Sequence, residues 1–246
     1  MESFLEMNDV TVIIPTTGAP ELKKAIMSVI HQTYDDVTCY VVNDGDHNHA
    51  KTSMLLARHF YRHPKIKYCC LPINVGANGF YGHRVYAAFT NLVNTKYVLY
   101  LDQDNWFEPN HIKSCIETIE KNNLQWCHSL RNIYEGELFV AEDNCESLGI
   151  YQTFQGGNHV DTNCYCVPTE IAVKVASAWF GGWGQDRVFL HELASRFPTF
   201  EGTGQHTVNY RLAGNEGSVK KEFFLTGNEI MKQRYNGGFP WKTLKT

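Results

Sequence analysis

Two acidic side chains separated by one residue are the first candidates for chemistry in this chain. Asp102 and Asp104 follow Tyr97–Leu101, a short apolar run of β-forming residues that predicts a strand buried on both faces. Alternate residues leaving a strand can turn toward the same side, so the two carboxylates can share one ligand. Carboxylate oxygens suit Mg²⁺ or Mn²⁺ carrying a substrate diphosphate. The alternative is that Asp104 and Asn105 only open a loop before the helix that Pro109 begins.

Length and composition limit the class of protein. The chain has 246 residues, 43% of them hydrophobic, which is enough for one sizeable core and at most two subdomains. The net charge of −4 and the sequence pI of about 6.2 give no general basic field, so we expect no nucleic-acid partner. The eight cysteines contain no C-x-x-C pair, and several fall inside expected strands and helices. Buried free thiols in a reducing compartment are therefore the favoured interpretation.

The start of the chain and its apolar runs indicate a location. Residues 1–9 carry three acids and no basic region ahead of a long apolar run, so they do not resemble a signal peptide. No segment approaches the roughly 18 apolar residues of a membrane span. We therefore expect a cytoplasmic protein, either free or peripheral at a membrane. The oligomeric state is not indicated by any pattern in the sequence.

Strands and helices alternate over the first half of the chain. The expected strands are Val10–Ile14, Val37–Val42, Ile66–Leu71 and Tyr97–Leu101, and the expected helices are Leu22–Ile30, Lys51–Tyr61 and, after a Gly-rich start, Ala77–Val93. This order predicts an α/β fold with a doubly wound, mostly parallel sheet and helices on both faces. Such sheets bind ligands beyond the carboxyl ends of their strands. Polar or turn residues stand at three of these ends, namely Pro15-Thr16-Thr17, Asn43-Asp44 and Asp102-Gln103-Asp104.

The second half is expected to be smaller in its regular structure. A helix with an apolar stripe follows Pro109, and two antiparallel strands then surround a Glu135-Gly136 turn. These two strands are expected at Leu124–Leu130 and Glu137–Val140. The further expected elements are an irregular acceptor-side loop at 141–156, a strand at 158–167, a helix from Pro168 to Ala178, and a helix in the tail at 220–246. We predict one domain over 1–246, with a nucleotide-binding half at about 10–105, an acceptor or catalytic half at about 106–215, and a tail at 216–246.

Several of these stretches also resemble the opening of family 2 glycosyltransferases, which have the GT-A fold. The resembling stretches are Val12–Thr16, Ala25–Tyr34 and Val41–Gly45, and the order continues with Asn74-Val75-Gly76, Gly82-His83-Arg84 and Leu101–Asn105. The resemblance covers about residues 10–215. It implies a metal-dependent, inverting transfer of a sugar from a nucleotide diphosphate.

The resemblance also implies roles for the residues at the strand ends. Pro15 and Thr16 are expected at the base and ribose, and Asp44 is expected to accept a hydrogen bond from the base, as the imide N–H of uracil would offer. Nucleotide-sugar binding is thereby assigned to Pro15, Thr16, Thr17, Asp44, Asn74, Gly76, Arg84, Asp102 and Gln103, and metal binding to Asp104 and Asp102. Asn43 departs from the usual acidic residue, which leaves the base less certain. Arg84 has two interpretations, a phosphate or ribose-side contact and an exposed helix arginine.

The stretch Phe180–Leu190 combines glycines, which let a backbone approach a ligand, with an aromatic ring and an acid. It resembles the family segment GG-x-G-E-D, whose Asp is the catalytic base, and Asp186 occupies that place. Gln185 replaces the usual Glu, and we expect it to change how the acceptor is held, while Trp183 offers a stacking face for the acceptor. The alternative for Asp186 is an ordinary helix cap.

The stretch Gln205–Asn215 resembles the family's closing strand, often YR-x-H, whose histidine can complete the metal shell. Ala213 stands in that place. His206, earlier on the same strand, is either its substitute as a metal ligand or a surface histidine. His159 and Asp161 either face substrate or form a polar pair at a strand edge.

We therefore expect a sugar transfer from a UDP-sugar to a hydroxyl of a glycan with Mn²⁺ or Mg²⁺ as cofactor. Uridine is favoured from family habit, with guanosine and thymidine as alternatives. A rival hypothesis is a non-catalytic sugar-nucleotide or glycan-binding domain of the same fold, which the departures at Asn43, Gln185 and Ala213 favour. A nucleotidyltransferase would want a basic phosphate loop after the first strand, and Pro15–Pro20 contains no basic residue.

Overall fold

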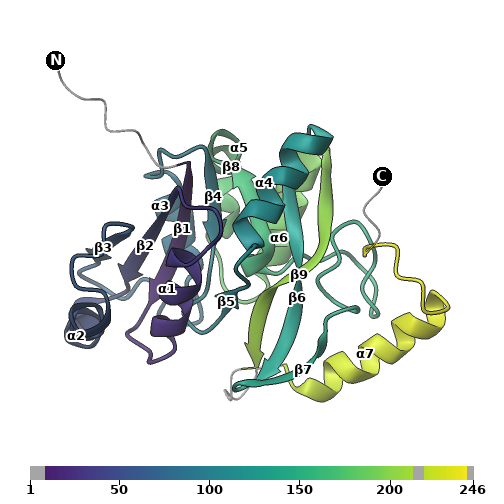
Figure 1. Cartoon of the computed structure of the whole chain (residues 1–246), viewed down its shortest axis with the longest axis horizontal. Coiled ribbons are helices and arrows are strands. Elements are labelled where there is room, and N and C mark those ends of the chain that lie inside the picture. Colours follow the sequence, from purple (N-terminus) through teal and green to yellow (C-terminus); the bar gives the residue numbers. More distant parts are fainter. Residues whose placement is uncertain (1–8, 213–218, 243–246) are drawn as a thin grey trace.

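A computed structural model describes residues 9–212 and 219–242 of the chain (Figure 1). Strands and helices alternate in the first half, as predicted. The elements are β1 (Val10–Thr16), α1 (Leu22–Ile30), β2 (Val37–Asn43), α2 (His49–His59), β3 (Ile66–Cys70), α3 (His83–Thr90) and β4 (Tyr97–Tyr100). The four strands lie side by side in the order β3-β2-β1-β4, and all their pairings are parallel.

The strand register brings the predicted strand ends to one edge of the sheet. Thr16 at the end of β1 pairs with Asn43 at the end of β2, and Ile13 pairs with Tyr100 on the other side. Every residue of β1 is buried, which agrees with an apolar strand covered on both faces. Asp44 and Asp102 therefore leave neighbouring parallel strands on either side of β1.

The second half extends the same sheet with mixed strand directions. Its elements are β5 (Trp106–Phe107), α4 (His111–Asn122), β6 (Trp126–Glu135), β7 (Leu138–Glu142), β8 (Tyr165–Pro168), α5 (Thr169–Val175), α6 (Gln185–Arg196), β9 (Phe200–Leu212) and α7 (Lys221–Arg234). The order continues β4-β8-β6-β9-β5, with β7 paired to β6, and gives nine strands in the described part of the chain. β8 runs antiparallel to β4 and β6, whereas β6 and β9 are parallel.

The structure shortens two predicted elements. The predicted strand at 158–167 is regular only in β8, because Asp161 accepts a hydrogen bond from the Asn163 N–H and starts a 3₁₀ turn at Thr162–Cys164. The predicted helix at 77–93 is reduced to α3, because the segment before it turns repeatedly, with Asn78 and Tyr81 at positive φ. The predicted hairpin is present, although β6 continues to Glu135 before the turn at Gly136.

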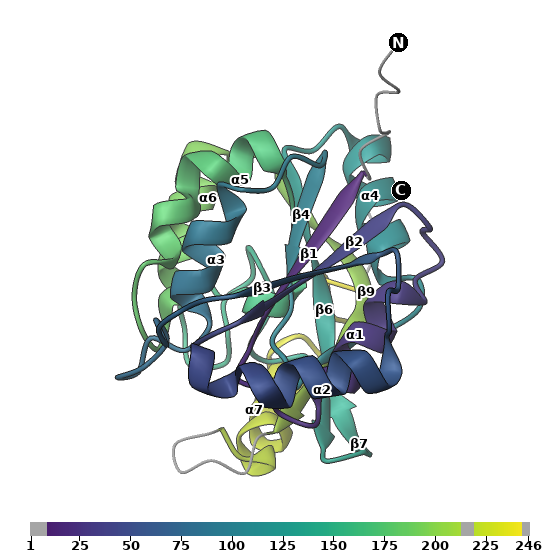
Figure 2. The same cartoon turned by 90° about the vertical axis from the view of Figure 1, so that its left-hand side faces the viewer.

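Helices cover both faces of the sheet, as predicted (Figure 2). The helices α3, α5 and α6 lie on one side, and α1, α2 and α4 lie on the other. The main core between these layers includes the apolar stripe of α4, in which Ile112, Cys115, Ile116 and Ile119 are buried. A second, smaller core joins β6 to α7 and the segment after it, with Leu130, Phe224 and Trp241 among its buried residues. The described part of the tail therefore packs on the domain.

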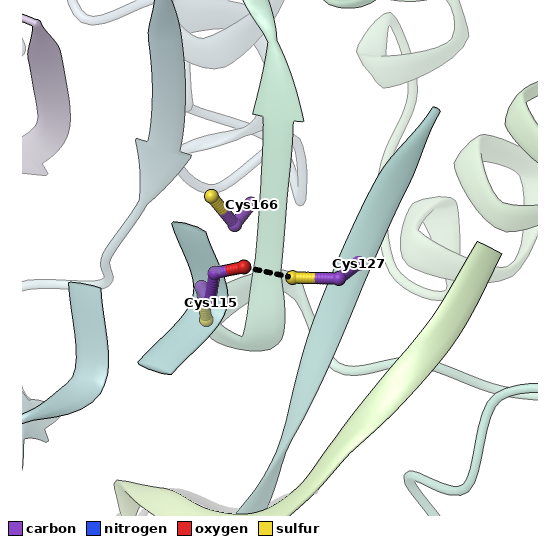
Figure 3. A group of neighbouring side chains, drawn as sticks. All are labelled: Cys115, Cys127 and Cys166. Atoms are coloured by element: carbon purple, nitrogen blue, oxygen red, sulfur yellow. Dashed lines mark hydrogen bonds between the residues drawn. The ribbon is translucent and has the colours of Figure 1, made fainter. Parts of the chain in front are cut away.

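All eight cysteines are free thiols, as predicted, and six of them are buried. Three of the buried thiols gather between α4, β6 and β8, where the sulfur atoms of Cys115, Cys127 and Cys166 lie within 4.8 Å of one another (Figure 3). The Cys127 thiol donates to the backbone carbonyl of Cys115 at 3.3 Å. Buried cysteines behave as small apolar side chains, and core packing accounts for this group. Among the described residues, no helix is both long and apolar enough to cross a membrane.

Candidate functional site

A cavity of about 620 Å³ lies at the carboxyl ends of the parallel strands. Most of the predicted site residues line it. From the first half these are Pro15, Thr16, Thr17, Asp44, Asn74, Gly76, Asp102, Gln103 and Asp104, and from the second half Trp183 and Asp186. The cavity thus brings together residues that the sequence places far apart, and it is large enough for a small ligand.

Polar side chains tie the end of β1 to the loop after β4. The Gln103 Oε1 accepts hydrogen bonds from the Thr16 hydroxyl at 2.7 Å and from the Thr17 N–H at 3.1 Å. The Thr16 hydroxyl in turn accepts from the Gly18 N–H at 2.9 Å. These bonds tie the loop after β1 to the loop after β4, which carries Asp104.

Asp44 holds the next part of the wall. Its two carboxylate oxygens accept hydrogen bonds from the N–H groups of Val75 and Gly76, at 2.7 and 2.8 Å. A Cβ on Gly76 would overlap the carbonyl oxygen of Tyr81, so this close turn requires glycine. Each carboxylate oxygen has more than one acceptor site, so Asp44 can hold this turn and still accept a donor from a ligand.

The side chain of Asn43, which departs from the family pattern, is used inside the fold. Its amide donates to the carbonyl of Gly45 at 2.8 Å, and its Oδ1 accepts from the Thr52 hydroxyl at 2.5 Å. Asn43 is fully buried and is not among the residues that line the cavity. The departure therefore affects the packing behind the site rather than its surface.

The two carboxylates of the D-x-D lie in a place that favours a positive charge. Asp102 accepts hydrogen bonds from the Tyr86 hydroxyl at 2.8 Å and the Asn163 amide at 3.0 Å. Burial and the charge of Asp161 raise the pKa of Asp102. Burial, followed by the charge of Asp102, raises the pKa of Asp104 from 3.8 to about 7. Two neighbouring carboxylates with raised pKa values oppose full ionisation, and a bound cation would offset their negative charges.

The charge of Arg211 lowers the pKa of Asp104 but does not outweigh burial and the charge of Asp102. Arg211 on β9 donates to the backbone carbonyl of Asp104 at 3.2 Å and to the Glu137 carboxylate at 2.6 Å. Within the described ranges, no lysine, arginine or histidine nitrogen lies within 4.0 Å of the carboxylate oxygens of Asp102 or Asp104. Hard oxygen ligands without a counter-charge fit Mg²⁺ or Mn²⁺.

Three residues predicted for the site do not line the cavity. Arg84 instead packs against two aromatic rings, with its guanidinium carbon 3.4 Å from the ring centre of Phe80 and 4.7 Å from that of Phe180. The reason is helix phase, since His83, one position earlier on α3, lines the cavity. Gln185 turns away from the cavity and donates to the Ala178 carbonyl at 2.5 Å.

His206 is the third of these residues. It lies on β9 opposite Leu130, with its Nδ1 3.8 Å from the Glu142 carboxylate, and burial lowers its pKa. It lies before Arg211, the β9 residue that reaches Asp104, and it is not among the residues that line the cavity. Ala213, in the family's histidine position, is outside the described residues.

Asp186 stands in the first turn of α6, and Gly184 rather than Asp186 is the N-cap. Its Oδ2 accepts a hydrogen bond from the His159 Nε2 at 2.6 Å, and its Oδ1 accepts from the Arg187 N–H at 2.9 Å. Burial alone would raise the pKa of Asp186, but the hydrogen bond and charge of His159 outweigh it and lower the pKa. Asp186 is therefore an ionised carboxylate that lines the cavity, as a general base must be.

Several cavity residues were not predicted from the sequence. Arg131 on β6 is buried, lies 2.8 Å from Asp143 and also pairs with Asp161. Both partners are too far from Arg131 in the sequence to form a short motif with it. His159, for which the sequence left two interpretations open, lines the cavity, is only 6% exposed, and lies with its Nε2 2.6 Å from the Asp186 Oδ2. Arg131 lies just past the predicted strand Leu124–Leu130, so no pattern indicated its burial, although an arginine is rarely buried unless it is paired.

The rim and the far wall of the cavity are aromatic. Trp183 is 81% exposed and Tyr81 is 59% exposed, and both line the cavity. A Cβ on Gly182 would lie 2.6 Å from the carbonyl oxygen of Gly79, so the loops carrying these two rings touch. Phe223 and Phe224 of α7 add to the far wall. Exposed rings beside polar groups are suited to stacking on the apolar face of a ligand.

The strand order, the carboxylates after β4 and the crevice at the strand ends define a GT-A type of fold. Glycosyl transferase family 2 matches residues 11–170, and the chain belongs to this family. An uncharacterized protein of Haemophilus influenzae is 41% identical over 142 residues, which are 49% of this chain and 90% of that protein.

Solved structures support the same fold. S. aureus TarS 1–349 has a TM-score of 0.64 at 12% identity, and the match covers 82% of this chain and 60% of that chain. The same protein in complex with UDP-GlcNAc gives 0.62 at 13% identity, with 95% and 68% covered. The mannosyltransferase PcManGT from Pyrobaculum calidifontis, in complex with GDP-Man and Mn²⁺, gives 0.57 at 10% identity, with 84% and 58% covered. This chain therefore covers 60% of the length of the TarS 1–349 chain.

Proposed function

We propose that the protein transfers a sugar, with inversion, from a nucleotide diphosphate sugar to an acceptor hydroxyl, with a divalent cation as cofactor. The observation that carries this proposal is the pairing of two kinds of carboxylate in one cavity. Asp102 and Asp104 have raised pKa values and no ion-pair partner within 4.0 Å among the described residues, whereas the pKa of Asp186 is lowered. A metal-bound diphosphate needs the first kind, and a general base needs the second.

The donor is proposed to lie along the ends of β1, β2 and β4. Asp104 and Asp102 would hold Mn²⁺ or Mg²⁺, which when bound neutralises the departing diphosphate. Pro15, Thr16 and Thr17 would contact the base and ribose, and Asp44 would accept the imide N–H of uracil. A UDP-sugar is the preferred donor, and the UDP and UDP-GlcNAc complexes of TarS support this preference.

The acceptor is proposed to enter beside Trp183, whose exposed ring can stack on a sugar of a glycan. Asp186 takes the proton of the attacking hydroxyl while the bond from the anomeric carbon to the diphosphate oxygen breaks. The anomeric carbon passes through an oxocarbenium-like state, as in glycoside hydrolysis. We further propose that the whole chain is one domain and works in the cytoplasm, which its eight free thiols support.

The rival hypothesis is a non-catalytic binding domain of the same fold. Its support came from the departures at Asn43, Gln185 and Ala213. The side chains of Asn43 and Gln185 are engaged outside the cavity, so these two departures leave its lining unchanged. Asp186, which a mere binding domain would not need in an ionised form, lines the cavity. These observations favour the enzyme.

A donor screen tests the proposal. The full chain is incubated with UDP-, GDP- and dTDP-sugars, with and without Mn²⁺, and its melting temperature and the release of nucleoside diphosphate are followed. We expect one donor to stabilise the fold only with Mn²⁺, by about 2.7 kcal/mol at a concentration of 100 times its dissociation constant, and to be hydrolysed slowly. Stabilisation without any release would favour the binding domain, and no response to any donor would reject both.

A further inference from the structure

A buried imidazole lies between two carboxylates at the acceptor side of the cavity. The Nε2 of His159 is 2.6 Å from the Asp186 Oδ2, and its Nδ1 is 3.2 Å from the Glu146 Oε1. The side chains of His159 and Glu146 are each only 7% exposed, and both residues line the cavity. The Nε2 contact is a hydrogen bond, whereas the Nδ1 contact is within ion-pair distance but lacks hydrogen-bond geometry. A ring between two carboxylates is favoured in its doubly protonated, positively charged form.

The charges around this histidine agree with a protonated ring. Burial lowers the pKa of His159, but the carboxylates of Asp186 and Glu146 outweigh it and raise the pKa from 6.5 to about 9, against an opposing charge from Arg131. Arg187 of α6 forms an ion pair with Glu146 and so holds the carboxylate that lies beside the His159 Nδ1. His83 on α3 also lowers the pKa of Asp186, as His159 does.

We propose, resting on the proposed function above, that His159 is a positioning residue for Asp186: as an imidazolium held by Glu146, it keeps the base ionised and fixes the carboxylate in the cavity. His159 keeps both of its ring protons throughout. The acceptor hydroxyl gives its proton to Asp186, its oxygen forms the bond to the anomeric carbon, and the diphosphate leaves with the electron pair of the bond that breaks.

Asp104 shows what a cavity carboxylate becomes without such a partner. It is buried beside another acid, and its pKa rises to about 7. Asp186 is buried as well, yet its pKa is lowered. The difference lies in the cation beside it, and a base that is protonated near neutral pH cannot accept a proton. His159 therefore extends the pH range over which Asp186 works.

The test compares His159→Gln with wild type, using hydrolysis of the donor that the screen identifies, at saturating Mn²⁺. Glutamine keeps an N–H for Asp186 but removes the positive charge. We expect the acidic limb of the kcat profile to move to higher pH by about one unit or more, with the donor KM changed by less than about threefold. His191→Gln, an exposed histidine on α6, is the matched control and should reproduce the wild-type profile.

Two outcomes overturn the proposal while wild-type turnover supports the proposed function. One is an unchanged pH profile in His159→Gln. The other is complete loss of turnover in His159→Gln at every pH together with substantial turnover in Asp186→Asn, because the histidine would then be the base. No wild-type turnover with any donor would instead overturn the proposed function itself.

A second measurement applies even if His159→Gln does not fold. NMR titration of ¹³Cε1-labelled histidines in the full chain, in wild type and Asp186→Asn, reports the imidazole directly. We expect one histidine to titrate above pH 8 in wild type and to titrate at least one pH unit lower in Asp186→Asn. Titration of every histidine near or below pH 6.5 in wild type would overturn the proposal.

Discussion

Asp104 and Asp186 line the same cavity, and their environments act on them in opposite directions. Burial raises the pKa of Asp104 to about 7, and the neighbouring Asp102 adds to the effect. Asp186 is also buried, but the hydrogen bond and charge of His159 lower its pKa. The charge of Arg211 is too weak to reverse the shift at Asp104, whereas Asp186 has a hydrogen-bonded histidine built into the fold.

This difference separates two tasks that the same side chain can perform. A carboxylate that lacks a counter-charge is free to bind a cation brought with the substrate. A carboxylate already paired to a buried histidine gains little from a metal but stays ready to accept a proton. The comparison predicts that changes at the two positions affect binding and turnover separately.

Asp104→Ala should have the largest effect on donor binding, because it removes a proposed metal ligand. We expect Mn²⁺-dependent binding of the donor to be lost, which means an affinity at least about 100-fold lower. Isothermal titration calorimetry with the screened donor measures this loss. Asp46→Ala, an exposed acid outside the cavity, is the matched control. Unchanged donor affinity in Asp104→Ala would refute the metal role.

Asp186→Asn should lower kcat by roughly 10²–10⁴-fold and leave donor affinity within about threefold of wild type. The amide keeps the shape of the side chain but cannot take a proton. Steady-state kinetics and calorimetry on the same preparation separate the two quantities. Asp35→Asn, at an exposed position, controls for the loss of one negative charge. Near-full turnover in Asp186→Asn would remove the assigned base.

The pH dependence of metal binding should also distinguish the two carboxylates. Because the pKa of Asp104 is about 7, protons compete with the metal below that pH. The Mn²⁺ affinity should fall by up to about tenfold for each pH unit below 7 and level off above it. In the metal-free protein the same raised pKa lowers stability as the pH rises. The reason is that the native state binds more protons than the unfolded chain between pH 4 and 7.

The consequence for stability is testable in Asp104→Asn. Wild type should lose stability as the pH rises from 4 to 7, and this variant should lose much less. Its melting temperature at pH 8 without metal should therefore be higher than that of wild type. Differential scanning calorimetry across this pH range shows the sign. Equal pH dependence in the two proteins would mean that the carboxylate of Asp104 keeps an ordinary pKa in the fold.

Arg84→Ala should have the smallest effect, because the guanidinium packs on Phe80 and Phe180 outside the cavity. We expect a change in donor affinity of less than about threefold, whereas Arg211→Ala, which removes a cation beside Asp104, should change it more. Parallel titrations of the two variants provide the measurement. An equal or larger loss in Arg84→Ala would place the arginine back at the nucleotide.

Much of the fold was predictable because its signals are local. Apolar runs and turn residues define β1, β2 and β4, and parallel strands joined by helices must place their carboxyl ends at one edge. Asp44, Asp102 and Asp104 come directly after these strands, so their meeting in one cavity follows from the topology. The predicted helix at 77–93 was too long because residues at positive φ, such as Tyr81, leave no clear pattern in the sequence.

The second half was less predictable because its contacts join distant segments. The place of His206 depends on the register of β9 against β6, which shifts at irregular positions between His128 and Arg131. The pairing of His159 with Asp186 joins a loop to a helix start, and neither stretch indicates the other. The sequence left two interpretations of Arg84 open, because a helix turns about 100° at each residue and one position decides which side a residue faces.

The order in which the chain supplies the cavity walls has a further consequence. Every residue proposed to hold the nucleotide or the cation lies before Asn105, whereas Trp183 and Asp186 lie beyond residue 170, where the family match ends. A single genetic crossover between two such proteins, placed in α4, would join the donor preference of one parent to the acceptor site of the other. Under the proposed function, chimeras made this way would offer a route to new glycosidic linkages that leaves the carboxylates after β4 untouched.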